Sequence, residues 1–483
     1  MYVIKKLLGI VVLGLFLSSN AYADKSYLKD FKDFLSDNAQ YIAENKIPNL
    51  KIVNICKDKK KYSKTWYKVG EKLWSLPKHE SDAACENRPG GVFGIKNNLK
   101  IKFYKDRSNI PWDGNPNFDT MFYYGYVLLY DDRGFKKIGS MPSKEPYKFS
   151  FDLKEDKDVK KEIQETGLLS YLLYENGKIT VDEKTPKDRF DIFYDDDTQW
   201  TSASMGKSIT SYVIGHCICE GYIDSVDTKL NDWPLIQNSL YYDQKLIDLL
   251  NMAAGDQKYS KINLTKGGKW SKNPNNNTVR FHMEKGIFKN TKGKARKSKY
   301  NYSNIVSNIL INYASFKSGE NFQNLLDKIF ISKAKIENPT YFKVMHTNSV
   351  QGHYNVDEKN DGAIRYSFKA SRYDYLRIAK AILDDWQNDT CVGKYLKTIH
   401  KNKIPKNHEW KDTKSSFFNP TAYAGFFHTN YSGMKKRAVL GMDGFGGQQI
   451  IIDFDLGRIV VINSVHWGYN WKKIAHSVIK KGK

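Results

Sequence analysis

The alternation of apolar and polar positions separates strand-like from helix-like segments along the chain. Two strand-like runs, Leu168–Tyr174 and Lys178–Asp182, flank Glu175-Asn176-Gly177, a sequence typical of a tight hairpin turn. Other segments show helical spacing, as in Tyr373–Trp386, where an apolar stripe recurs every three or four residues. The pattern predicts helices over Thr201–Glu220, which Gly221 ends, Lys245–Met252, Ser303–Phe316, Tyr373–Trp386 and Trp471–Lys481.

Strands return near the end of the sequence. Gln448–Phe454 and Arg458–Ser464 are predicted strands joined through Asp455-Leu456-Gly457. Because strands occur at both ends of this part of the chain and helices lie between them, we expect one sheet assembled from distant segments, with a helical insertion.

The segment before residue 166 differs from the rest of the chain in its predicted elements. Asp30–Asn45 is a predicted helix, Met121–Tyr130 is a predicted buried strand, and the charged run Lys154–Glu165 is interpreted as a connection. None of these segments contains a motif that carries chemistry. The sequence therefore predicts an N-terminal accessory domain of unknown role over residues 24–165 and a main domain over residues 166–483.

The first residues have the features of a secretory signal peptide. Lys5 and Lys6 precede the apolar run Leu7–Leu17, and Ala21-Tyr22-Ala23 supplies a small-x-small cleavage pattern. No cysteine follows the apolar run, which argues against a lipid anchor. We therefore expect residues 1–23 to be a signal peptide and the protein to be exported, in the periplasm. No later run approaches eighteen apolar residues, so no integral membrane segment is expected after cleavage.

The net charge of +24 falls to +22 after removal of Lys5 and Lys6, because residues 1–23 contain no acidic side chain. Such a charge could attract anionic polymers, membrane headgroups or nucleic acid. The basic residues are, however, scattered among acidic ones, and the densest group, Lys285–Lys299, resembles a solvated loop. No nucleic-acid-binding motif accompanies the charge, so no nucleic-acid partner is expected.

The five cysteines are an odd number for an exported chain. Cys56 and Cys85 lie in the same region and are candidates for a disulfide. Cys217 and Cys219 diverge on a predicted helix, so they are not expected to pair with each other, and Cys391 has no evident partner. No cysteine has histidine neighbours at ligand spacing, so we expect no metal site and no cofactor.

Ser204-Met205-Gly206-Lys207 is the first candidate for chemistry. At the start of a helix, Ser204 and Lys207 lie one turn apart on the same face, where the lysine could activate the serine hydroxyl. The positive end of the helix favours the alkoxide and lowers the affinity of the lysine for its proton. The motif is weak alone, because five other serines in the chain have a lysine three residues later. Only Ser204 opens an amphipathic helix directly after a hairpin.

Tyr302-Ser303-Asn304 is the second element. A phenol held beside an ammonium group can ionise below its usual pKa of about 10 and act as a general base, while the asparagine binds a substrate carbonyl. Tyr174-Glu175-Asn176 has the same pattern, but it is better explained by the hairpin turn.

The third element is a glycine-rich strand entry, Gly444-Phe445-Gly446-Gly447-Gln448. Glycine there allows substrate and backbone to approach closely, and the strand could complete an oxyanion hole. Lys317-Ser318-Gly319 resembles a Lys-Thr-Gly motif, but it ends a predicted helix, so Gly319 is interpreted as a helix stop.

With these three motifs in this order, residues 166–480 resemble the serine β-lactamase and penicillin-binding-protein family, which includes class C β-lactamases, D-alanyl-D-alanine carboxypeptidases and esterases. The 6-aminohexanoate-dimer hydrolases are the most similar group. Glu220-Gly-Tyr-Ile-Asp224 and Leu249–Gly255 add to the resemblance. It implies an α/β (α+β) fold of the β-lactamase/transpeptidase type, with an antiparallel sheet flanked by helices and a helical subdomain.

The resemblance also implies residue roles. Ser204 would be the acylated nucleophile, Lys207 its partner, Tyr302 the proton shuttle and Asn304 a substrate ligand. The backbone at Gly444 and Phe445 would complete the oxyanion hole with the N–H of Ser204. Met442 departs from the family, which has Lys or His there to bind a substrate carboxylate. This departure argues against β-lactams and D-alanyl peptides as substrates.

The leading hypothesis is therefore an exported serine hydrolase that cleaves a small amide or ester through an acyl-enzyme on Ser204. One alternative is a peptidoglycan D-alanyl carboxypeptidase or β-lactamase. Another, of a different class, is a catalytically lapsed protein that binds ligands in the same cleft. The sequence does not indicate an oligomeric state.

Overall fold

The structure is a computed structural model, and the parts of the chain it describes are separated by gaps. The described residues are 28, 30–45, 52–54, 65–69, 72–75, 93–96, 99–103, 118–130, 135–187, 189–190, 194–257, 259, 278–286, 288–294, 299–345, 362–406 and 419–482. The predicted signal peptide and the candidate pair Cys56 and Cys85 lie outside the described residues, and both stay predictions.

The chain divides into two compact units. Unit 1 comprises Met1–Asp131, Gln164–Gly167 and Lys184–Asp195, and unit 2 comprises Asp132–Ile163, Leu168–Glu183 and Asp196–Lys483. The expected boundary at residue 166 differs from this division, because residues 132–163 belong to unit 2. The segment interpreted as a connection contains helix α5 (Lys157–Glu165), whose Val159 and Ile163 are buried in the core of unit 2.

Unit 1 contains helical residues 30–37, α2 (Ala39–Glu44), α4 (Phe118–Tyr130) and a four-stranded sheet. The strand order is β1-β4-β2-β3, with bounds Ile52–Asn54, Phe93–Lys96, Thr65–Val69 and Lys72–Ser75. The expectation of a strand over Met121–Tyr130 is wrong, because that segment is α4. A continuous apolar run does not distinguish a buried strand from a buried helix, and the rings of Phe31 and Phe122 pack edge to face at 5.2 Å.

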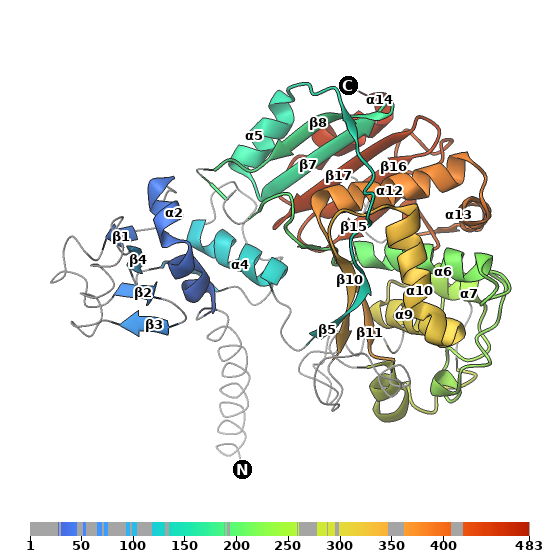
Figure 1. Cartoon of the computed structure of the whole chain (residues 1–483). Helices are drawn as coiled ribbons and strands as arrows, with labels where there is room; N and C mark the ends of the chain where they lie inside the picture. Colours follow the sequence, from blue (N-terminus) through green and yellow to red (C-terminus); the bar gives the residue numbers. More distant parts are fainter. Residues whose placement is uncertain are drawn as a thin grey trace, which may run out of the picture. The chain divides into compact units, whose positions relative to one another are not determined.

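The main sheet of unit 2 has nine strands drawn from both ends of the unit (Figure 1). Neighbouring strands from β12 (Ile404–Pro405) to β7 (Leu168–Glu175) pair antiparallel, whereas β6 (Ser150–Phe151) pairs parallel with β8 (Lys178–Lys184). Asn176 and Gly177 both have positive φ, as a type I′ hairpin turn requires, and they join β7 to β8 as predicted. The order is β12 (Ile404–Pro405), β13 (Ala422–Ala424), β14 (Phe427–Thr429), β15 (Val439–Gly444), β16 (Gln448–Asp453), β17 (Arg458–Ser464), β7 (Leu168–Glu175), β8 (Lys178–Lys184) and β6 (Ser150–Phe151).

Helices cover both faces of this sheet. Successive side chains of a strand point to opposite faces, so two neighbouring residues of β7 show which helices lie on each face. Ser170 faces α12 (Arg372–Gln387), where it accepts a hydrogen bond from Arg372. Tyr171, the next residue, points the other way and donates to the carbonyl of Ile474 at 2.7 Å. That face packs against α5 and the C-terminal helices η8 (Lys472–His476) and α14 (Ser477–Lys481). An antiparallel sheet flanked by helices is thus confirmed.

A helical layer and a second, four-stranded sheet form the rest of unit 2 (Figure 1). Helix α6 (Met205–Cys219) packs on α9 (Asn304–Ser318) and on α13 (Cys391–Lys401), and α7 (Leu246–Leu250) and α10 (Phe322–Asp327) also contact α9. The small sheet has the order β5 (Phe135–Ser140), β10 (Thr340–Met345), β11 (Ile364–Ala370), β9 (Trp200–Thr201).

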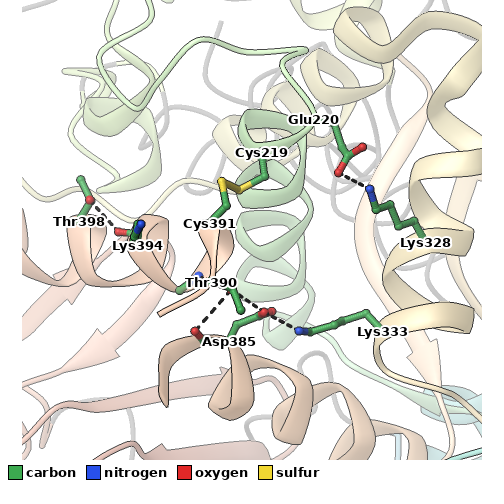
Figure 2. The surroundings of a disulfide bond; sticks show 10 residues. Cys219, Glu220, Lys328, Lys333, Asp385, Thr390, Cys391, Lys394 and Thr398 are labelled. Atoms are coloured by element: carbon green, nitrogen blue, oxygen red, sulfur yellow. Dashed lines mark hydrogen bonds and ion pairs between the residues drawn. A yellow bond between two sulfur atoms is a disulfide. The ribbon is translucent and has the colours of Figure 1, made fainter. Parts of the chain in front are cut away.

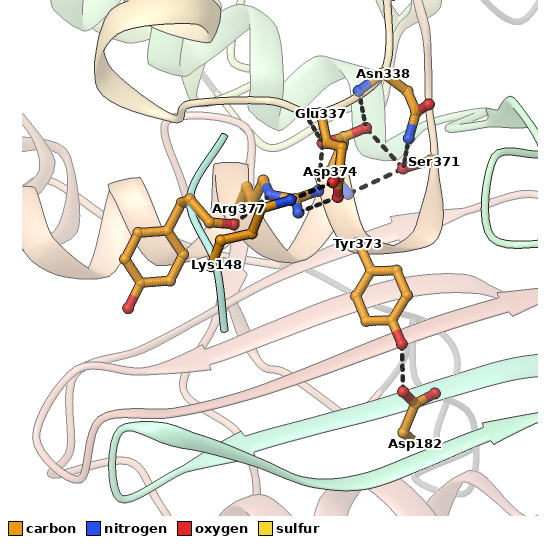
Figure 3. A network of polar contacts seen from close by, with 9 residues as sticks. Lys148, Asp182, Glu337, Asn338, Ser371, Tyr373, Asp374 and Arg377 are labelled. Atoms are coloured by element: carbon orange, nitrogen blue, oxygen red, sulfur yellow. Dashed lines mark hydrogen bonds and ion pairs between the residues drawn. The ribbon is translucent and has the colours of Figure 1, made fainter. Parts of the chain in front are cut away.

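A polar network fixes the start of α12 (Figure 3). Ser371 caps the helix by accepting from the N–H of Asp374, whose carboxylate accepts from the backbone N–H of Glu337 at 2.7 Å. Arg377 forms ion pairs with both Asp374 and Glu337. Tyr373 donates to Asp182 of the main sheet. These bonds position the end of β11, which immediately precedes α12.

A disulfide links the end of α6 to the start of α13 (Figure 2). Cys219 and Cys391 are 172 residues apart in sequence, and their Cα atoms are 5.8 Å apart. Cys217 is buried and is not in a disulfide, as expected for two cysteines that diverge on one helix. Cys391 has no evident partner in the sequence, because only the packing of α13 on α6 brings its sulfur atom to that of Cys219.

None of the helices in the described part of the chain is long and apolar enough to cross a membrane.

Candidate active site

Ser204 lies at a sharp turn between β9 and α6. Ser202, before this turn, exchanges backbone and side-chain hydrogen bonds with Phe368 of β11, which anchors the turn to the small sheet. Ala203 has a φ of 45°, an uncommon value for a residue with a Cβ. Ser204 then occupies the N-cap position of α6, where its hydroxyl lies at the positive end of the helix.

Lys207 is fully buried one turn into α6, and its amine faces Ser204. Its Nζ lies 3.1 Å from the hydroxyl oxygen of Ser204 and 2.8 Å from Oδ1 of Asn304. The Nζ also lies 4.8 Å from the ring centroid of Tyr302. The three predicted motif residues are therefore brought together around one amine, although they are about a hundred residues apart in sequence.

Tyr302 and Asn304 are positioned by the entry into α9. Ser303 is the N-cap residue of α9, and the preceding Asn301 is fixed by a 2.7 Å bond from its N–H to the carbonyl of Met252. The side-chain amide of Asn301 also donates to Asp256 at 2.9 Å. The hydroxyl of Tyr302 is hydrogen-bonded to Ser204.

Tyr366 of β11 is a fifth residue of the site, and no sequence motif indicates it. Its hydroxyl is hydrogen-bonded to Ser204 and lies 3.0 Å from Oδ1 of Asn304, and its ring centroid lies 3.6 Å from Nζ of Lys207. Tyr366 reaches Ser204 only because β11 packs against both α6 and α9. A tyrosine in a strand-like run gives no sequence signal that could have identified it.

The burial of the site changes the order of the proton affinities. Burial, with a smaller contribution from Arg365, holds the pKa of Lys207 well below its usual 10.5. Burial raises the pKa of Tyr302 well above 10, and the hydrogen bond with Ser204 only partly offsets it. The expected fall in the pKa of this phenol is therefore wrong for the free site. In the free site Lys207 therefore holds its proton less strongly than an exposed lysine, and Tyr302 holds its proton more strongly than an exposed tyrosine.

Gly444 allows the end of β15 to approach the turn between β9 and α6, which carries Ser204. A Cβ at this position would lie 2.3 Å from the carbonyl oxygen of Ser202, so only glycine fits there. Phe445 follows at the tip of the hairpin, where its ring packs edge-on against Trp467 at 5.0 Å. Among the described residues, the backbone N–H groups of Ser204 and Phe445 donate no hydrogen bond. Two N–H groups that are free to donate, one at Ser204 and one at Phe445, are the kind of donors that can hold an oxyanion.

Met442 and Asp443 occupy the position where the family has a Lys or His, and neither places a cation there. Met442 is fully buried, and its apolar side chain offers the site no charged group. The next residue, Asp443, accepts from Gln449 at 2.8 Å and lies 3.7 Å from Nε2 of His428. The other ring nitrogen of His428 lies 2.8 Å from Nζ of Lys406, and burial lowers the pKa of this lysine to about 7.

The two other segments that match the motif patterns, Lys317–Gly319 and Tyr174–Asn176, have structural roles. Lys317 forms an ion pair with Asp232 at 2.6 Å, and Gly319 ends α9 with a φ of 55°, which confirms its interpretation as a helix stop. Tyr174-Glu175-Asn176 belongs to the β7–β8 hairpin. Within the described residues, no group of three or more His, Cys, Asp or Glu side chains is arranged to hold a metal ion.

No protein-family model matches the chain, and no curated protein matches its sequence. Solved structures do match its fold. A protein of Bacillus anthracis assigned as a 6-aminohexanoate-dimer hydrolase superimposes with a TM-score of 0.50 at 13% identity, over 78% of this chain and 96% of its own. FmtA from Staphylococcus aureus matches with a TM-score of 0.45 at 16% identity, over 74% of this chain and 95% of its own. The first match shows that the chain has the β-lactamase/transpeptidase-type fold.

Proposed function

We propose that the protein is a serine hydrolase that cleaves an amide or ester through an acyl-enzyme on Ser204. The observation that carries this proposal is the position of Nζ of Lys207, 3.1 Å from the hydroxyl oxygen of Ser204. Burial lowers the pKa of Lys207, which favours its neutral form, and a neutral amine can accept the serine proton.

In the first step, Oγ of Ser204 attacks the carbonyl carbon of the substrate while its proton passes to Lys207. The carbonyl oxygen becomes an oxyanion, which the N–H groups of Ser204 and Phe445 bind. Collapse of this intermediate breaks the bond to the leaving group, which takes a proton from the Tyr302 hydroxyl. The proton on Lys207 then returns Tyr302 to its neutral form.

In the second step, water attacks the ester carbonyl of the acyl-enzyme. Lys207 accepts a proton from this water, the acid product leaves, and Ser204 regains its hydrogen. Asn304 lies 2.8 Å from the lysine amine and 3.0 Å from the Tyr366 hydroxyl, and it orients these groups and the substrate carbonyl. We favour an amide or oligomer over an ester, because the Gly444–Gln448 segment resembles that of 6-aminohexanoate-dimer hydrolases.

The same proposal includes export through the signal peptide at residues 1–23, to the periplasm. The Cys219–Cys391 disulfide supports it, because disulfides persist in oxidising compartments. Unit 1 contains none of the proposed catalytic residues, and we propose that it is an accessory domain.

Labelling with a fluorophosphonate probe tests the nucleophile. The mature protein should gain one adduct, located by mass spectrometry on the peptide containing Ser204. Ser204→Ala should abolish it, whereas Ser332→Ala, at an exposed serine that also has a lysine three residues later, is the matched control and should keep it. Labelling that persists in Ser204→Ala would contradict the proposal. Small esters, aminohexanoate oligomers and a chromogenic cephalosporin then distinguish amidase or esterase from β-lactamase activity.

A further inference from the structure

Arg365 of β11 is a buried arginine without a partner for two of its nitrogen atoms. The residue is 7% exposed, and among the described residues neither Nε nor Nη1 has a hydrogen-bond partner. Other buried arginines of unit 2 are paired. Arg372 contacts Asp182 and Asp196, and Arg377 contacts two carboxylates at the start of α12.

An unpaired guanidinium is costly to bury, because it loses hydration without gaining a protein anion. The fold supplies anions to Arg372 and Arg377, so the absence of a carboxylate at Arg365 is specific to that position. Groups of this kind are found where a ligand completes the pairing.

The backbone of β11 is irregular where Arg365 lies. The register pairs Phe342 with Phe368 and Val344 with Ile364, so one residue of β10 faces three residues of β11, including Arg365. Such a bulge redirects side chains, and bulges occur frequently beside active sites. The bulge is held from the other side by α9, where Asn308 accepts from the N–H of Tyr366 at 3.1 Å.

This irregular segment directly borders the nucleophile. Tyr366, the residue after Arg365, lies against Ser204, Lys207 and Asn304. The charge of Arg365 also acts on the amine of Lys207, whose pKa it helps to lower. Arg365 is thus a fixed positive charge close to the reacting groups, and it comes from a different element than the third motif, where Met442 offers no charge.

We propose that Arg365 binds a carboxylate of the substrate, so that the enzyme acts on amides or esters that carry an acidic group. This inference rests on the proposed hydrolase function and specifies its substrate class. A guanidinium suits a carboxylate because its planar donors match the carboxylate oxygens in geometry and charge. A bound carboxylate would accept hydrogen bonds from Nε and Nη1 of Arg365, which have no acceptor among the described residues.

Matched ester pairs test the inference. In one pair, 4-nitrophenyl pentanoate is compared with 4-nitrophenyl hydrogen glutarate, whose acyl chain ends in a carboxylate instead of a methyl group. In the other pair, phenyl acetate is compared with 3-acetoxybenzoate, which has the carboxylate on the leaving group. The wild-type enzyme should have a kcat/KM at least about tenfold higher for the anionic member of one pair, since a hydrogen bond to a charged group contributes about that much.

Arg365→Gln should reduce this preference by about ten- to hundredfold. The preference is the ratio of the two kcat/KM values of a pair. An indirect effect of the substitution on Lys207 lowers both kcat/KM values, so it cancels in the ratio. Arg458→Gln is the matched control, because it removes an arginine that pairs with Glu175, and it should keep the preference.

Two outcomes overturn the inference and leave the hydrolase proposal intact. One is a wild-type enzyme that hydrolyses both pairs without preferring either anionic ester, a measurement that does not depend on a variant's folding. The other is a preference that Arg365→Gln retains. Failure to hydrolyse any ester, together with no fluorophosphonate adduct on Ser204, instead overturns the proposed function and this inference with it.

Discussion

Two phenols, Tyr302 and Tyr366, are hydrogen-bonded to Ser204 from different elements, and they differ in what they can contribute to a reaction. Tyr302 belongs to the motif before α9, and its hydroxyl is the proposed proton donor. Tyr366 lies in β11 and also approaches Asn304 at 3.0 Å, which suits a role in positioning.

Tyr302→Phe should lower kcat by about 10²–10⁴-fold, the usual contribution of proton transfer by a positioned side chain. Tyr366→Phe should lower kcat/KM by only about 3–10-fold, as expected for loss of one neutral hydrogen bond. Steady-state kinetics on an ester that both variants hydrolyse would check this. Equal losses in the two variants would contradict the division of roles.

His216 in α6 provides a pH-dependent contribution to stability. The residue is buried, and burial lowers its pKa to about 4, whereas an unfolded histidine has a pKa of about 6.5. Between these values the unfolded chain binds a proton that the folded chain lacks, so stability falls as the pH falls. The full contribution below pH 4 is about 3 kcal/mol.

His216→Gln should therefore flatten the pH dependence of unfolding on the acid side. Urea denaturation at pH 7 and near pH 4 measures the free energy of unfolding of both proteins. The loss of stability between these two pH values should be smaller in the variant. Parallel losses would show that His216 does not titrate as described.

At the scale of elements, the hairpin of β15 and β16 depends on Gly444. Gly444→Ala would place a Cβ 2.3 Å from the carbonyl oxygen of Ser202 and push the strand away from the nucleophile turn. We expect a loss of about 1–3 kcal/mol of stability and slower labelling of Ser204. Thermal unfolding and the rate of fluorophosphonate labelling measure the two effects separately, and an unchanged labelling rate would argue against an oxyanion hole at Phe445.

Elements differ in how well the sequence predicts them. Helix α6, helix α9 and the strands β16 and β17 were predicted closely, because their apolar spacing, turns and stops are local features. Met121–Tyr130 was predicted wrongly, because a continuous apolar run suits a buried helix or a buried strand equally well. The neighbours that bury it decide between the two.

At the scale of the whole molecule, the Cys219–Cys391 disulfide joins distant parts of unit 2. It closes a loop of 172 residues in sequence, and such a crosslink chiefly restricts the unfolded chain. Cys219→Ser combined with Cys391→Ser should lower the free energy of unfolding by about 2–5 kcal/mol.

Denaturant unfolding with and without a reductant measures this contribution. The reductant should destabilise the wild type more than the double variant, which keeps only the candidate pair Cys56 and Cys85. Cys217→Ala is the matched control, because it removes a cysteine from the same helix and should keep the sensitivity to reductant. A wild type that unfolds identically in both conditions would show that the crosslink does not stabilise the protein.

The sequence by itself determined the order of three motifs, the elements that begin or end at them, and the nucleophile they indicate, because each depends on residues close together in the chain. Only the tertiary structure placed Tyr366 beside Ser204 and paired Cys219 with Cys391. It also lowers the pKa of Lys207 and raises that of Tyr302. A pKa depends on burial and on neighbouring charges, and both are produced by packing between segments that the sequence keeps far apart.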